Sequence, residues 1–117
     1  MTTQVDRDMA MELALTILND GQTYHRVIRP TILNYARKRV NKTYDREMAI
    51  KGIVNNIVEP GLTRYRREWG PIGRVNRATK ERAAREILSG MMDEIRDAEA
   101  RMKALKAAGK PWTLRGR

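Results

Sequence analysis

The chain has 117 residues, no cysteine, no phenylalanine and a formal net charge of +10. This length suits one domain with a modest core, and the lack of cysteine excludes a disulfide framework and a thiolate metal site. Because the N-terminus lacks a signal-peptide pattern and no apolar run reaches membrane-spanning length, we expect a cytoplasmic protein.

The basic residues gather in three blocks. Residues 21–44 and 101–117 contain Lys and Arg but no Asp or Glu, and residues 61–85 contain far more basic than acidic residues. Residues 1–20 and 86–100 are net acidic. This distribution predicts basic patches, which attract polyanions such as nucleic acid or an acidic protein surface.

Two helices are predicted in the first part of the chain. Apolar residues spaced three and four apart predict a helix over Asp6–Asn19, with Asp6 as its N-cap. Gln22–Arg29 is expected to be a connector. Proline is favoured in the first turn of a helix, so the second helix is predicted from Pro30 to Val40.

A third helix is predicted to begin after Asp45, its N-cap. Its apolar stripe begins at Ile50 and keeps its phase beyond Pro60 as far as Trp69. A proline inside a straight helix costs about 3 kcal/mol, because it lacks an N–H group and crowds the preceding turn. We therefore expect either a kink at Glu59–Gly61 or two shorter helices that share one buried face.

The longest predicted helix runs from Arg77 to about Ala108, with Asn76 or Thr79 as its N-cap. Its apolar residues alternate in spacing between four and three, which is the pattern of a heptad seam. The sequence leaves open whether the earlier helices, a second copy in a homodimer, or another partner covers this seam. The seam consists of Ala84, Leu88, Met91, Ile95, Ala98, Met102 and Leu105.

No segment shows the alternation typical of a strand. The sequence therefore predicts an all-α fold, a small bundle of about four helices with a long C-terminal helix carrying a heptad-like seam. Residues 1–109 are expected to form a single helical domain, and residues 110–117 a basic C-terminal tail.

The sequence argues against catalysis. His25 is the only histidine, and no zinc, phosphate-loop or nucleophile motif is present. The carboxylates of Asp93, Glu94, Asp97 and Glu99 crowd one helix, which is more typical of a solvated face than of a metal site. We expect no catalytic residues, no metal site, no cofactor and no enzymatic activity.

Two basic clusters are the candidate nucleic-acid contacts. The first lies at the corner between the second and third helices, compatible with a helix-turn-helix reader or with cations that stabilise a helix C-terminus. In the second, Tyr65 and Trp69 alternate with arginines and could stack bases, although both also fall on the apolar stripe. The predicted phosphate contacts are Arg37, Lys38, Arg39, Lys42, Arg64, Arg66, Arg67, Arg74 and Arg77.

The tail carries Lys110, Trp112, Arg115 and Arg117. It could become ordered on a partner, or it could be a frayed end with Trp112 packed against the last helix. Membrane binding is not expected, since the apolar sides of the basic helices are better explained by core packing.

The segment Tyr44-Asp45-Arg46-Glu47-Met48-Ala49-Ile50-Lys51, followed by Tyr65-Arg66-Arg67-Glu68-Trp69-Gly70, resembles a pattern in small accessory proteins of tailed bacteriophages. The resemblance covers roughly residues 30–90, and Pro60-Gly61 departs from it. It implies a viral origin and a place in the host cytoplasm, and it supplies no residue roles.

Two functions follow from these patterns as hypotheses. The first is a non-enzymatic basic module that binds nucleic acid or a nucleoprotein complex through phosphate contacts, which are salt-dependent. The alternative is a phage-encoded protein–protein module that docks on a host enzyme through the long helix or the tail and inhibits or redirects it. In that case the positive charge would steer it to an acidic surface. A structural role in the virion is a third hypothesis.

Overall fold

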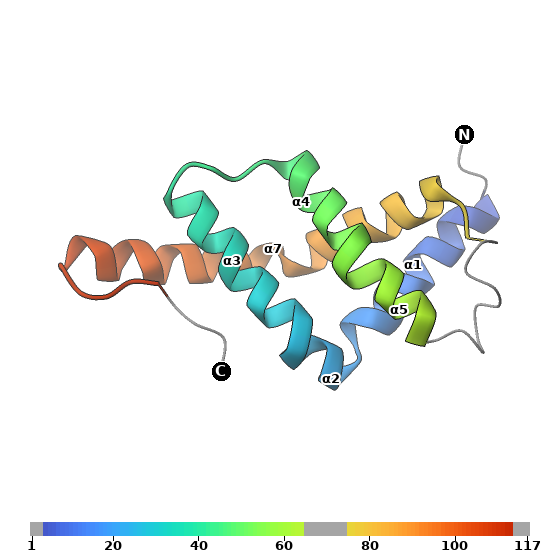
Figure 1. Cartoon of the computed structure of the whole chain (residues 1–117), viewed down its shortest axis with the longest axis horizontal. Helices are drawn as coiled ribbons and strands as arrows, with labels where there is room; N and C mark the ends of the chain where they lie inside the picture. The colour runs from blue at the N-terminus through green and yellow to red at the C-terminus, as the bar shows by residue number, and fades with distance from the viewer. Residues whose placement is uncertain (1–3, 65–74, 114–117) are drawn as a thin grey trace.

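The computed structural model describes residues 4–64 and 75–113, which form helices joined by short connections and contain no strand. This confirms the predicted all-α bundle. The longest helix, α7 (Arg77–Ala107), runs along most of the molecule, and the other helices cross it or lie beside it (Figure 1). The side chain of Asn76 accepts a hydrogen bond from the Thr79 N–H, so Asn76 is the N-cap and Thr79, the other predicted candidate, lies inside the helix.

The first helix, α1 (Gln4–Leu18), begins before the predicted residue, so Asp6 lies inside its first turn and is not the N-cap. Ala10, Leu13, Ala14 and Ile17 are buried along the side that faces the core. Their spacing places them on one helical stripe, as the sequence predicts. This stripe packs against α7.

The predicted connector over Gln22–Arg29 is wrong. The chain is helical from Gly21 onward, through α2 (Gly21–Thr23), η1 (Tyr24–Ile28) and α3 (Arg29–Val40). Asp20 starts this helix, because its carboxylate accepts hydrogen bonds from the N–H groups of Gln22 and Thr23. The segment η1 is a π turn, in which the Arg29 N–H donates to the Tyr24 carbonyl, and Pro30 comes next.

The same arrangement recurs around the second proline. The helix runs through α4 (Arg46–Ile53), η2 (Val54–Val58) and α5 (Glu59–Arg64) without a break, so the expected division into two helices is wrong. The Glu59 N–H donates to the Val54 carbonyl, and Pro60 follows. A π turn directly before the proline makes space for its ring. It also lets the helix continue although proline has no N–H group to donate. Tyr65 and Trp69 lie outside the described residues.

Asp45 caps α4 as predicted, accepting hydrogen bonds from the N–H groups of Glu47 and Met48. Beyond the cap, one buried face continues through the π turn. Its residues are Ala49, Ile50, Ile53, Ile57, Val58, Gly61 and Leu62. The shared buried face on both sides of Pro60 is therefore confirmed.

The chain's own helices cover the apolar seam of α7. The side chains of α1, α3, α4 and η2 pack on it, and the seam residues Leu88, Met91, Ile95 and Met102 are almost completely buried. Leu105, near the end of the helix, is half-buried. Because these side chains belong to the core of one chain, they are not available to a second copy. The predicted homodimer interface on this seam is not supported.

The end of α7 turns the chain back on itself. Gly109 has a positive φ of 71°, and the Lys110 N–H donates to the Leu105 carbonyl at 3.0 Å. This is a Schellman motif, which reverses the chain after the helix, and Figure 1 shows the terminal segment folding back beside α7. Trp112 is partly buried against the core. Of the two possibilities for the tail, ordering on a partner or packing of Trp112 on the last helix, the structure has the packing of Trp112.

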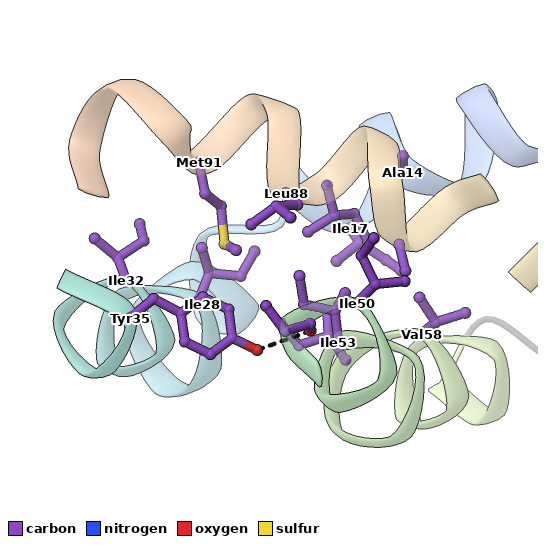
Figure 2. Packing of buried hydrophobic residues seen from close by; sticks show 14 of the residues in the cluster. Ala14, Ile17, Ile28, Ile32, Tyr35, Ile50, Ile53, Val58, Leu88 and Met91 are labelled. Carbon is purple, nitrogen blue, oxygen red and sulfur yellow. Dashed lines mark hydrogen bonds between the residues drawn. The ribbon is translucent and has the colours of Figure 1, made fainter. Parts of the chain in front are cut away.

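A buried tyrosine joins the two proline-containing helices. The Tyr35 hydroxyl donates a hydrogen bond to the Ala49 carbonyl at 2.9 Å, drawn as a dashed line in Figure 2. Burial raises the pKa of this hydroxyl, so it stays protonated and able to donate. A Cβ atom at Gly52 would lie 3.1 Å from the same hydroxyl oxygen. Gly52 therefore provides the space in which the hydroxyl sits.

We predict opposite effects of Gly52→Ala in two backgrounds. Tyr35→Phe alone should lower the free energy of unfolding by about 1 kcal/mol through loss of the hydrogen bond. Gly52→Ala should lower it in the wild-type chain but raise it by up to about 1 kcal/mol in the Tyr35→Phe background, where alanine's helix propensity is no longer offset by crowding. Urea unfolding of the four chains measures this coupling, and additive effects would contradict it.

Candidate nucleic-acid interface

Three grooves beside α7 differ in charge. One of about 330 Å³, against η1 and α3, has two arginines and two carboxylates in its wall. A second of about 540 Å³, against α4 and η2, has four basic and three acidic side chains, of which Lys80 pairs with Glu59 and Arg77 with Glu81. Basic and acidic side chains are therefore nearly equal in number in both grooves, and Arg85 of the second groove also lines the third.

The third groove, of about 300 Å³, lies between the α3–α4 corner and the middle of α7. Four arginines and no carboxylate line it. We call it the arginine groove, and its lining residues are Arg39, Tyr44, Arg46, Arg85, Leu88, Ser89, Met92 and Arg96.

One wall of the arginine groove is a single stripe of α7. Arg85, Ser89, Met92 and Arg96 are spaced four, three and four residues apart, so they lie one above another on one side of the helix. Leu88 belongs to the buried seam and is 3% exposed. The arginines therefore stand at the edge of the core, with apolar side chains between them.

The opposite wall is the corner between α3 and α4. It contributes Arg39 from the last turn of α3, Tyr44 from the connection and Arg46 from the first residue of α4. The connection is held by a hydrogen bond from the Thr43 N–H to the Lys38 carbonyl at 2.8 Å. Lys42 lies in the left-handed region, with φ of 59°, at the position where a Schellman motif usually has glycine.

Arg39 is held in place by a carboxylate outside the groove. Its Nε donates to Glu99 Oε1 at 2.6 Å, and Lys103 Nζ lies 2.9 Å from Glu99 Oε2. The hydrogen bonds from Arg39, first, and from Lys103 hold the pKa of Glu99 below its ordinary value of 4.5, against the opposing effect of burial. The Arg39 guanidinium also lies 5.5 Å from the Tyr44 ring centroid, so it fixes that ring.

The other arginines of the groove are much less neutralised. Arg85 and Arg96 are exposed, and neither forms an ion pair with a carboxylate in residues 4–64 or 75–113. Arg46 lies 3.7 Å from Glu47, in a pair whose two side chains are both well exposed. Such a surface pair contributes little. The groove therefore presents three guanidinium groups to an incoming anion.

The nine predicted phosphate contacts do not form one patch. Arg37, Lys38 and Lys42 are exposed at the α3–α4 corner, beside Arg39. Arg64 is at the end of α5, where it donates to Thr23 and Gln22 and thus ties α5 to α2. Arg77, at the start of α7, is paired with Glu81.

The remaining predicted contacts, Arg66, Arg67 and Arg74, lie outside the described residues, as do Arg115 and Arg117 of the tail. In the described part of the tail, Lys110 is exposed and Trp112 has the Lys106 ammonium 5.1 Å from its ring centroid. This contact places Trp112 against α7, away from the arginine groove.

Six residues of the groove are not among the predicted contacts: Tyr44, Arg46, Arg85, Ser89, Met92 and Arg96. The four-three-four spacing of the α7 stripe was available as a signal. Arg96, however, lies in a net acidic block of the chain, so block charge alone did not indicate it.

Comparison of the chain with protein-family models, with curated proteins and with solved structures gives no match. The resemblance to accessory proteins of tailed bacteriophages therefore stays a prediction. Within the described ranges, no group of three or more His, Asp or Glu side chains is arranged to hold a metal ion. No helix there is long and apolar enough to cross a membrane.

The Arg39–Glu99 pair gives a pH-dependent prediction. Because the pKa of Glu99 is lower in the folded chain, its ionisation stabilises the fold above about pH 4.5 and this contribution is lost as the pH falls through the lowered value. Glu99→Gln should lower the free energy of unfolding by about 1 kcal/mol at pH 7.

At pH 3 the difference between Glu99→Gln and wild type should shrink. Urea unfolding at both pH values measures it, with Glu12→Gln on the exposed side of α1 as the matched control. An equal difference at both pH values would show that the carboxylate's charge is not responsible.

Proposed function

We propose that the protein is a non-enzymatic nucleic-acid-binding module and that phosphates are bound at the arginine groove. The observation that carries this proposal is the charge of the groove, since four arginines and no carboxylate line it, while the two neighbouring grooves have nearly equal numbers of basic and acidic side chains. Guanidinium groups are suited to phosphate because their planar donors match two of its oxygens.

The surroundings of the groove support the same proposal. Arg37, Lys38 and Lys42 are exposed on the adjacent corner and form no ion pair among the described residues. They extend the positive surface beyond the cavity, as a polyanion with several phosphates requires. Arg64 and Arg77, by contrast, are engaged within the chain and are not part of the proposed site.

Lys42 adds an independent argument. A residue with a Cβ in the left-handed region is strained by about 1–2 kcal/mol, which glycine would avoid. A lysine at this position therefore costs stability while placing an exposed ammonium group at the basic corner. Such a cost is typical of a residue with a binding role.

The protein-docking alternative has less in its favour. Of its two proposed docking elements, the long helix and the tail, the apolar side of the helix is buried in the core. Met11 and Leu15 on α1 and Met48 on α4 are the large apolar side chains that stand exposed among the described residues. A few exposed apolar side chains are ordinary for a monomer surface.

The first test is a charge reversal with a matched control. Arg85→Glu combined with Arg96→Glu should weaken oligonucleotide binding at least tenfold. The fall of log affinity with log salt concentration should also become shallower, by about two units of slope. Arg29→Glu combined with Arg101→Glu changes the net charge equally but lies beside the neighbouring groove, and it should weaken binding much less.

Fluorescence anisotropy at several salt concentrations measures both variants. Equal losses in the two would show that binding depends on net charge and not on the arginine groove. An affinity for oligonucleotides that does not change with salt would contradict the proposed phosphate contacts.

The second test separates stability from binding at Lys42. Lys42→Gly should raise the free energy of unfolding by about 0.5–1 kcal/mol, because the strain is relieved. The same variant should bind the oligonucleotide several-fold more weakly. Thermal unfolding and fluorescence anisotropy measure the two effects. An unchanged affinity would show that Lys42 does not contact the oligonucleotide.

A further inference from the structure

The arginine groove has an apolar interior beneath its basic rim. The Tyr44 ring and the Met92 thioether line it, both half-buried, and Leu88 lies beneath them. Phosphates alone would require only cations on an open surface. An aromatic ring and a thioether between cations provide instead the apolar contact that an unstacked base needs.

The size of the groove distinguishes between forms of nucleic acid. Its volume of about 300 Å³ is at the lower end of the range for small-molecule sites. A duplex hides the faces of its bases by stacking them on one another. A duplex could therefore lay only its backbone across the opening, whereas one unpaired nucleotide could enter.

The Tyr44 ring is held before any ligand arrives. Its centroid lies 6.0 Å from that of Tyr35, in an edge-to-face contact, and the Arg39 guanidinium lies 5.5 Å from it. Tyr35 is itself held by its hydrogen bond to the Ala49 carbonyl, and Arg39 by its ion pair with Glu99. A fixed ring loses little conformational entropy when a base stacks on it.

Polar groups are placed around this ring to bind the rest of a nucleotide. Ser89 offers a hydroxyl that can donate to or accept from a base edge or a sugar hydroxyl. Arg46 and Arg85 come from opposite walls, and Arg96 stands at the far end of the α7 stripe. Phosphates on either side of a bound base would thus meet a guanidinium group.

We infer that the ligand of the arginine groove is single-stranded nucleic acid, one unpaired nucleotide of which enters the groove. Its base contacts Tyr44 and Met92, and the flanking phosphates contact Arg46, Arg85 and Arg96. This inference rests on the proposed function, and it adds the strandedness of the ligand and the residues that contact the base.

The test compares oligonucleotides of one mixed sequence as single-stranded DNA, single-stranded RNA and duplex DNA, with the full chain near physiological salt. We expect at least one single-stranded form to bind at least tenfold more tightly than the duplex. Tyr44→Leu, which removes the ring, should weaken single-strand binding about tenfold and leave duplex binding nearly unchanged.

Tyr44→Phe is the matched control, because it keeps the ring and should keep most of the affinity. Circular dichroism and thermal unfolding check that both variants stay folded. Met92→Ala tests the opposite wall of the groove. It should weaken single-strand binding several-fold, which is less than Tyr44→Leu, because no aromatic ring is removed.

The outcomes separate this inference from the proposed function. Duplex binding as tight as single-strand binding, with both weakened by Arg85→Glu and Arg96→Glu, would overturn the single-strand inference and leave the proposed function standing. Tight single-strand binding that neither Tyr44→Leu nor Met92→Ala changes would also overturn it. No salt-dependent binding to any of the three forms would overturn both.

Discussion

The structure depends on the burial of one apolar face of α7 by helices from the same chain. Leu88, Met91, Ile95 and Met102 occupy the centre of the core, and α1, α3 and α4 are placed by their contacts with this face. Figure 2 shows Leu88 and Met91 pointing from α7 toward the side chains of α3 and α4. Because that face is already covered, a ligand that binds to α7 must use the stripes on either side of it.

The arginine groove is a direct consequence of this packing. The stripe of Arg85, Ser89, Met92 and Arg96 lies beside the buried seam on α7, and the α3–α4 corner comes to rest opposite it. The corner is positioned by the two capped helices and by the Tyr35–Ala49 hydrogen bond that joins them. The residues that build the core thus also set the distance between the two basic walls.

Local signals in the sequence were sufficient for most of the fold. Apolar spacing indicated the helices, and the caps at Asp45 and Asn76 are where the side-chain chemistry predicts them. The two π turns before Pro30 and Pro60 were not predicted, because they depend on tertiary packing that keeps each helix intact across a proline. The groove was missed for a similar reason: Arg39 and Arg96 are far apart in the chain and meet only after α3 has packed on α7.

The proposed ligand site lies between the α3–α4 corner and the middle of α7. The most direct measurement is a titration of the ¹⁵N-labelled protein with a short single-stranded oligonucleotide, followed by amide chemical shifts. We expect the largest shifts in residues 39–46 and 85–96, with little change in α1 and around Trp112. Shifts concentrated on α1 or on the residues after α7, with the groove unchanged, would contradict it.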